Sequence, residues 1–202
     1  MKATFQRIYA TNVWGDAESR SGLASNLVHT KRIQAELPKL IQELNIAKLL
    51  DIPCGDFFWM RHVNLGAARY IGADIVPDLI QVNQKQFSST NREFRVLDIT
   101  ADELPQADLI LCRDCFIHFS NRRVKQALRN LKKSRSRYLL TTTFPNRSEN
   151  EDTFTGGWRP ISLNAEPFRF PPPLRLIAEL DMNEVPEDSA LGLWSVDEIP
   201  TY

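Results

Sequence analysis

The sequence predicts an α/β protein with a doubly wound, mainly parallel sheet of seven strands that ends in an antiparallel hairpin. Short β-rich runs alternate with helical patterns through the middle of the chain, which is typical of a parallel sheet covered on both faces. Acidic residues recur at the ends of these runs at the spacing of one βα unit. After Pro173, two strand-like runs lie too close together for another full crossover helix.

The β-rich runs define the strands of this sheet. Five of them are predicted to lie parallel: 48–52, 69–75, 93–99, 108–112 and 137–144. The runs 174–180 and 190–196 are predicted to form the antiparallel hairpin.

Helical patterns lie between the strands, near 56–64, 77–87 and 121–134. Pro77 suits the first turn of the second of these helices. Residues 33–44 carry a further apolar stripe that Pro38 would kink or split. Segment 121–134 places Val124, Ala127, Leu128 and Leu131 on one face and fills the rest with Lys and Arg. We interpret that basic side as a solvated outer face, with a phosphate-rich partner as the alternative.

Composition excludes several classes of protein. The chain has 202 residues, of which 43% are hydrophobic and 25% charged, so we expect one globular domain over 1–202. Its 25 basic and 25 acidic residues cancel, which argues against a dedicated nucleic-acid binder. No run approaches the roughly 18 apolar residues of a membrane span, and the first residues lack the apolar core of an export signal. Three cysteines, an odd number, favour a reducing, cytoplasmic location.

Carboxylates mark the predicted strand ends, where ligands of doubly wound sheets bind. Asp51 and Asp74 are 23 residues apart, and Asp74 and Asp98 are 24 apart. Asp74 occupies the position of an acid that hydrogen-bonds ribose hydroxyl groups. The first turn, however, has only Gly55 followed by Asp56, and that carboxylate would repel a dinucleotide pyrophosphate. A ligand with adenosine, no phosphate and a positive end fits better.

The runs LLDIPCGD, YIGADI, VLDI and CRDCFIHF together resemble the class I S-adenosylmethionine-dependent methyltransferases, over about residues 45–144. The resemblance implies a Rossmann-like seven-stranded sheet with a reversed last hairpin, and S-adenosylmethionine as cofactor. By position it assigns the methionine part to residues 51–56, the ribose to Asp74 and the adenine to Asp98 with Ile99. Pro53 and Phe57 stand where the family usually has glycines. The cofactor-binding residues expected on this basis are Asp51, Pro53, Cys54, Gly55, Asp56, Asp74, Ile75, Asp98, Ile99 and Arg113.

A metal site is the competing interpretation of the cysteines. Cys112 and Cys115 have C-x-x-C spacing, and Cys54 and His118 would complete four zinc ligands. Dithiol redox chemistry is a further alternative for the pair. Buried free cysteine is also a common small core residue, and we expect no metal.

The acceptor side of the site is expected after the fourth strand. The resemblance places Asp114 and His118 beside the transferred methyl group, as the candidate catalytic residues. Loop 145–173 has 29 residues and six prolines, so it is either a lid over the site or a cover that replaces a helix. The N-terminal segment 1–30 is expected to cap the cofactor, although residues 11–25 could equally be mobile.

We therefore predict a methyltransferase that acts on an O, N or S nucleophile of a small-molecule acceptor. The alternative is a non-catalytic nucleoside- or zinc-binding protein on the same fold, because fold does not fix function.

Overall fold

The structure is a computed structural model that describes residues 1–179 and 188–202. Its centre is a seven-stranded sheet with the order β3-β2-β1-β4-β5-β7-β6. The strands are β1 (Lys48–Asp51), β2 (Arg69–Asp74), β3 (Arg92–Val96), β4 (Leu109–Cys112), β5 (Tyr138–Thr143), β6 (Arg175–Ala178) and β7 (Ala190–Ser195). All seven lie within the predicted strand segments except for the start of β3, which is one residue earlier than expected.

Strand direction follows the prediction. The strands from β3 to β5 pair in parallel, and β7 pairs antiparallel with both β5 and β6. The order reverses between β1 and β4, which are neighbours in space although β2 and β3 separate them in sequence. A crevice forms at such a switch point because the connections leave the two strands toward opposite sides.

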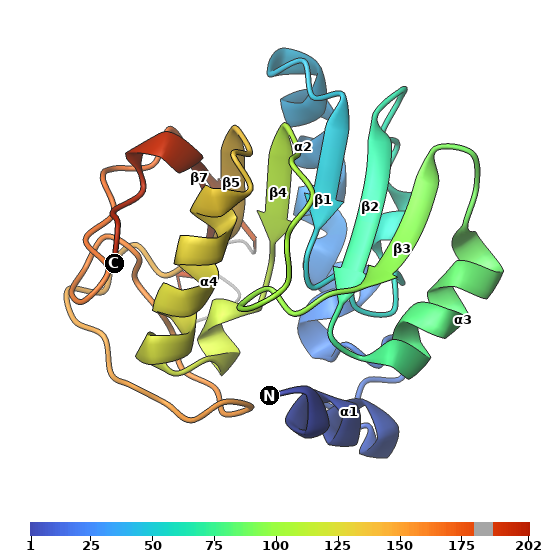
Figure 1. The fold of residues 1–202 in the computed structure, drawn as a ribbon, viewed down its shortest axis with the longest axis horizontal. Helices are drawn as coiled ribbons and strands as arrows, with labels where there is room; N and C mark the ends of the chain where they lie inside the picture. Colours follow the sequence, from blue (N-terminus) through green and yellow to red (C-terminus); the bar gives the residue numbers. More distant parts are fainter. Residues whose placement is uncertain (180–187) are drawn as a thin grey trace.

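Helices cover both faces of the sheet (Figure 1). They are α1 (Lys2–Thr11), α2 (Leu27–Glu43), α3 (Pro77–Phe87) and α4 (Asn121–Lys133). The buried residues of α2 and α3 share one core layer with Leu49, whereas those of α4 share the other layer with Leu50. Side chains of successive strand residues point to opposite faces, so β1 contributes to both layers.

Of the three helices predicted between the strands, two are confirmed and one is wrong. Helix α3 begins at Pro77, and the four apolar residues predicted for α4 are its buried residues. Residues 56–64, however, contain only a short 3-10 turn, Met60–His62. Phe57 has a φ of 59°, in the left-handed region, so no α-helix passes through this residue. That backbone turns the Phe57 ring into the core, where it contacts Tyr70 and Phe94.

Further differences concern the N-terminal half. Helix α2 runs from Leu27 without a break, with Pro38 inside it. Helix α1 was not expected at all. It lies below the carboxyl ends of the strands, in dark blue in Figure 1.

The second half of loop 145–173 contributes buried side chains to the core. Ile161, Leu163, Phe168 and Phe170 are buried in the same core layer as α4. This segment therefore takes the place of a helix between β5 and β6, as one of the two interpretations predicted.

No helix in the described part of the chain combines the length and the apolar character that crossing a bilayer requires.

Candidate active site

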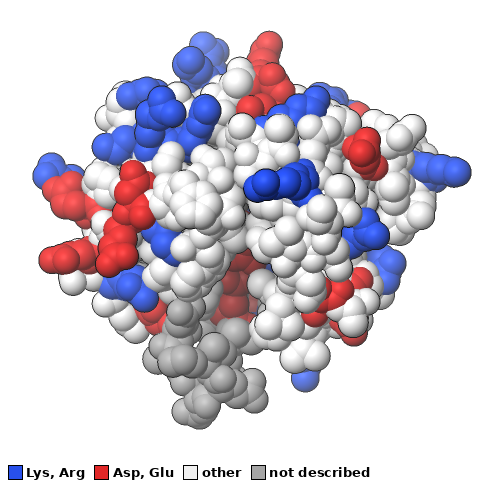
Figure 2. Space-filling model, turned by 90° about the horizontal axis from the view of Figure 1, so that it is seen from below, with Lys and Arg blue, Asp and Glu red and all other residues white. Residues whose placement is uncertain are grey.

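A cavity of about 390 Å³ opens at the carboxyl ends of β1, β2 and β4. Its position is the switch point of the sheet, where the sequence placed the site. Figure 2 views this side of the molecule and shows acidic atoms at the floor of a hollow with largely uncharged walls.

The cavity gathers nearly every residue that the sequence proposed. Those that line it are Asp51, Pro53, Cys54, Gly55, Asp56, Asp74, Ile75, Ile99, Arg113, Asp114 and His118. Asp98 does not line it, because this carboxylate accepts hydrogen bonds from the backbone N–H and the hydroxyl of Thr100. β3 ends at Val96, so Asp98 lies in the following turn rather than at the strand end. The neighbouring Leu97 and Ile99 reach the cavity instead.

Asp51 is the last residue of β1 and is 3% exposed. The Tyr70 hydroxyl donates a hydrogen bond of 2.6 Å to its Oδ2 atom. Burial nevertheless raises the pKa of Asp51 to about 7, since desolvation of the carboxylate outweighs this hydrogen bond. The nearby Asp74 carboxylate adds to the rise. A cation bound beside Asp51 would favour its charged form.

Asp74 ends β2 and is 7% exposed. Its Oδ1 accepts from the Val76 N–H at 3.0 Å, and its Oδ2 accepts from the Gly55 N–H at 3.3 Å. Burial raises the pKa of Asp74 to about 6, because desolvation of the carboxylate outweighs these hydrogen bonds. The carboxylate therefore joins the first and second strand ends, at the place where the sequence predicted a ribose contact.

Asp56 lines the cavity and also contacts the N-terminal segment. Its carboxylate accepts hydrogen bonds from the Ser19 hydroxyl at 3.0 Å, the Arg20 N–H at 2.8 Å and the Ser21 hydroxyl at 3.2 Å. The Asp56 N–H in turn donates to Ser21 Oγ at 3.0 Å. Asp56 thus holds the N-terminal segment against the first turn.

Gly55 permits this close approach. A Cβ atom at Gly55 would lie 2.3 Å from Ser21 Oγ, and its φ of 53° is in the left-handed region that favours glycine. The single glycine retained in the turn is therefore required by the N-terminal segment above it.

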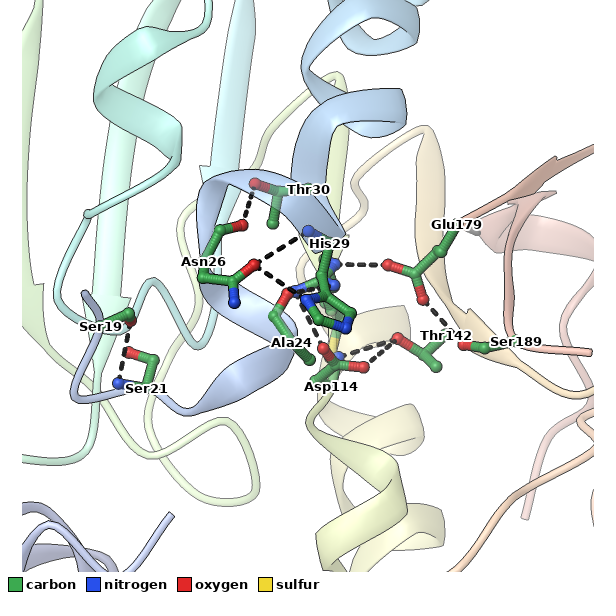
Figure 3. A network of polar contacts seen from close by, with 12 residues as sticks. Ser19, Ser21, Ala24, Asn26, His29, Thr30, Asp114, Thr142, Glu179 and Ser189 are labelled. Carbon is green, nitrogen blue, oxygen red and sulfur yellow. Dashed lines mark hydrogen bonds and ion pairs between the residues drawn. The ribbon is translucent and has the colours of Figure 1, made fainter. Parts of the chain in front are cut away.

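A buried ion-pair network beside the cavity joins Arg113 and Asp114, which follow β4, to Glu179, which follows β6. Arg113 Nε donates to Glu179 Oε1 at 2.5 Å, and Arg113 Nη1 lies 2.9 Å from Asp114 Oδ2. The Ser189 hydroxyl donates to Glu179 Oε2, and Arg113 Nη2 donates to the Ala24 carbonyl. Figure 3 shows the labelled carboxylates of Asp114 and Glu179 converging from the two strand ends.

Two carboxylates pair with the one guanidinium of this network. Burial alone would lower the pKa of Arg113, but the carboxylates of Asp114 and Glu179 outweigh it and raise the pKa. Asp114 also accepts from the Thr142 hydroxyl at 3.1 Å and donates its own N–H to Thr142 Oγ1 at 2.8 Å. Asp114 Oδ2 is buried and meets Arg113 in an ion pair but has no hydrogen-bond partner among the described residues.

His118 follows β4 in the short turn Phe116–His118. Its Nδ1 atom lies 2.7 Å from the Gly157 carbonyl, which can only accept, so Nδ1 carries the hydrogen. Nε2 then bears a lone pair and has no hydrogen-bond partner among the described residues. Burial lowers the pKa of His118 below 6.5, which keeps the ring neutral at physiological pH.

The sequence predicted a cap from residues 1–30 and offered loop 145–173 as a lid, but it did not identify the side chains that form most of the cavity walls. They come largely from α1, from the segment after it and from positions far apart in the chain: Phe5, Ile8, Tyr9, Trp14, Phe119, Phe144 and Trp158. Phe5, Ile8 and Tyr9 recur on one side of a helix, and this spacing was the available signal. Trp158 is the part of loop 145–173 that reaches the cavity, so the lid interpretation applies to it alone among the described residues.

The three cysteines are buried and free. Burial raises the pKa of the Cys54 thiol, and a hydrogen bond with Cys112 together with burial raises that of Cys115. Within the described residues, no three His, Cys, Asp or Glu side chains form a group that could hold a metal ion. The zinc interpretation therefore has no ligand set there.

Comparison with known protein families matches residues 49–135 to the model of a methyltransferase domain. This segment is a methyltransferase domain. It runs from β1 through α4 and so contains the ends of β1, β2 and β4, at which the cavity opens, which confirms the resemblance predicted from the sequence. No curated protein sequence matches the chain.

Solved structures place the methyltransferase domain in the expected fold. Human N-acetylserotonin methyltransferase, in complex with S-adenosylmethionine, aligns with a TM-score of 0.55 at 12% identity, over 92% of this chain and 64% of that one. The methyltransferase domain of bacterial CtHen1-C aligns with a TM-score of 0.50 at 11% identity, over 58% of this chain and 66% of that one. The chain therefore spans just under two thirds of the length of both proteins. At such low identity the likeness concerns the fold.

Proposed function

We propose that this protein is an S-adenosylmethionine-dependent methyltransferase that methylates an O, N or S nucleophile of a small-molecule acceptor. The observation that carries the proposal is one continuous cavity that joins two buried carboxylates, Asp51 and Asp74, to a neutral histidine, His118. The first two lie at the strand ends typical of a nucleoside ligand. His118 lies at the other side, after β4.

The cavity fits this cofactor chemically. S-adenosylmethionine carries ribose hydroxyl groups, which suit the acceptor oxygens of Asp74, and a positive sulfonium and ammonium. Desolvation by burial raises the pKa values of Asp51 and Asp74, and the positive charge of Arg113 offsets this only in part at Asp51, so a cationic ligand would stabilise both carboxylates. One side of the cavity is apolar and suits the adenine ring of the cofactor; it is formed by Ile75, Leu79, Leu97 and Ile99.

When bound, the cofactor supplies an electrophilic methyl group on sulfur. Direct displacement requires the protein to hold donor and acceptor in line and to exclude water. The aromatic walls provided by Trp14, Phe144 and Trp158 serve the exclusion of water. They also favour an acceptor with an apolar or aromatic body.

His118 is proposed as the general base. Its Nδ1–H is directed to the Gly157 carbonyl, so Nε2 remains to take a proton from an acceptor hydroxyl, thiol or ammonium group. Asp114, the other predicted catalytic residue, is proposed to position the β4 end through Arg113 and Thr142.

We further propose that residues 1–202 act as one domain. Support comes from the cavity itself, which residues of the N-terminal segment, of the strand ends and of loop 145–173 line together.

Calorimetry with S-adenosylmethionine, S-adenosylhomocysteine and NAD tests the cofactor. We expect binding of the first two and none of NAD, and NAD binding of equal strength would contradict the proposal. An acceptor panel scored by S-adenosylhomocysteine release then tests catalysis. Binding without turnover of any nucleophile would favour the non-catalytic alternative.

A further inference from the structure

Arg20 is distinctive among the charged side chains that line the cavity. Asp51, Asp56, Asp74, Asp114 and Glu179 each accept hydrogen bonds from the protein, and Arg113 is paired with two carboxylates. The Arg20 guanidinium has no carboxylate or carbonyl partner within the described residues. Its contact is with the Tyr9 ring, whose centroid lies 5.5 Å from Cζ.

Among the described residues, this contact leaves the donors of the Arg20 guanidinium unused and able to bind a ligand. A guanidinium placed over an aromatic face keeps its N–H groups in its own plane, where they can form the two parallel hydrogen bonds that a carboxylate accepts. Tyr9 restrains the side chain of Arg20 without using these donors. The arrangement suits capture of a planar anion.

The backbone fixes Arg20 beside the first turn. Its N–H donates to Asp56 Oδ2, and the adjacent Ser21 hydroxyl lies against Gly55. The cation is therefore anchored at the turn that the proposed function assigns to the methionine part of the cofactor. That part is a zwitterion, and the cavity offers several carboxylates for its ammonium group. Arg113, the other arginine, is already neutralised by Asp114 and Glu179.

We infer that Arg20 binds the α-carboxylate of the cofactor's methionine part, an assignment that rests on the proposed function. The N-terminal segment then binds the amino-acid end of the ligand, while Asp74 binds the ribose end. Arg20 is accordingly a specificity residue that distinguishes S-adenosylmethionine and S-adenosylhomocysteine from nucleosides without an amino acid.

Calorimetry with two thioether ligands tests this inference. S-adenosylhomocysteine carries the carboxylate, and methylthioadenosine lacks the whole amino-acid end. We expect Arg20→Ala to weaken S-adenosylhomocysteine binding roughly 10- to 100-fold, as loss of charge-assisted hydrogen bonds does, and to change methylthioadenosine binding less than about twofold. Arg20→Lys should restore part of the affinity. Arg7→Ala, an exposed arginine of α1 outside the cavity, is the matched control and should leave both affinities unchanged.

The outcomes separate the two proposals. Equal weakening of both ligands by Arg20→Ala would mean that Arg20 only holds the segment in place, and no weakening would mean that it does not meet the carboxylate. Either result overturns the inference and leaves the proposed function standing. Failure of the unaltered protein to bind either ligand would instead overturn the proposed function.

Discussion

The imidazole of His118 is stacked on the indole of Trp14, with ring centroids 4.6 Å apart and planes inclined by 24°. Trp14 belongs to the N-terminal segment and His118 to the turn after β4. The proposed base is therefore held between Trp14 on its face and the Gly157 carbonyl at Nδ1. Three segments far apart in sequence fix one ring, so its orientation depends on the whole site.

His118→Asn should lower turnover about 10²- to 10⁴-fold while S-adenosylmethionine affinity stays nearly unchanged, because the change removes Nε2 and retains an N–H near Nδ1. Burial lowers the pKa of His118, so the unaltered enzyme should lose activity only as pH falls below 6.5, when the ring gains its proton. Turnover against pH and calorimetry measure the two effects. His62→Asn, at an exposed histidine outside the cavity, should change neither. A fully active His118→Asn variant would show that His118 does not act as the general base.

Asp51→Asn should stabilise the ligand-free protein at neutral pH. Folding raises the pKa of Asp51 from 3.8 to about 7, so the folded state binds the proton more tightly and loses stability as pH rises between these values. The variant should gain up to about 4 kcal/mol of unfolding free energy near pH 8 and almost none near pH 3.5. Urea unfolding at the two pH values measures this difference.

Asp108→Asn is the control of opposite sign. Hydrogen bonds from the Lys48 and Ala47 N–H groups lower the pKa of Asp108, against a desolvation effect that raises it. Its contribution to stability is present at neutral pH and is lost as pH falls through the lowered pKa. This variant should therefore destabilise the protein near pH 7. A gain of stability in both variants would contradict the sign argued for Asp51.

Asp56→Ala should release the N-terminal segment from the first turn, because Ser19, Arg20 and Ser21 lose a common acceptor. We expect faster amide hydrogen exchange in residues 16–25 and weaker S-adenosylhomocysteine binding, by roughly 10-fold or more. Exchange in α4, which lies on the other face of the sheet, should not change. Unaltered exchange in residues 16–25 would show that packing alone holds the segment.

Trp158→Ala and Phe168→Ala should separate the two roles of loop 145–173. Trp158 is 51% exposed, lines the cavity and contacts Phe144 edge-on, so its loss should raise KM for the acceptor with little change in stability. Phe168 is fully buried, so its loss should cost about 3–5 kcal/mol of stability. Thermal unfolding and steady-state kinetics provide the two readouts. A large loss of stability in Trp158→Ala would show that Trp158 belongs to the part of the loop that covers the sheet.

The sequence by itself determined the sheet and the floor of the site. Strand residues such as Leu49 and Leu50 are apolar on both faces, and this continuous burial makes parallel strands recognisable without any tertiary information. The spacing of Asp51 and Asp74 then follows from the βα unit. Because parallel strands end at one edge, residues at their ends meet in one cavity.

Tertiary structure alone decided what each carboxylate does and what encloses the cavity. Asp56 and Asp74 look equivalent in sequence, but Asp56 accepts hydrogen bonds from Ser19 and Ser21 of the N-terminal segment, whereas Asp74 accepts from the backbone of Gly55 and Val76. Phe57 lies in a helical pattern, yet packing of its ring against Tyr70 imposes a left-handed backbone. Such contacts join residues that are far apart in the chain. Local sequence patterns cannot predict them, because their energy comes from burial in the assembled core.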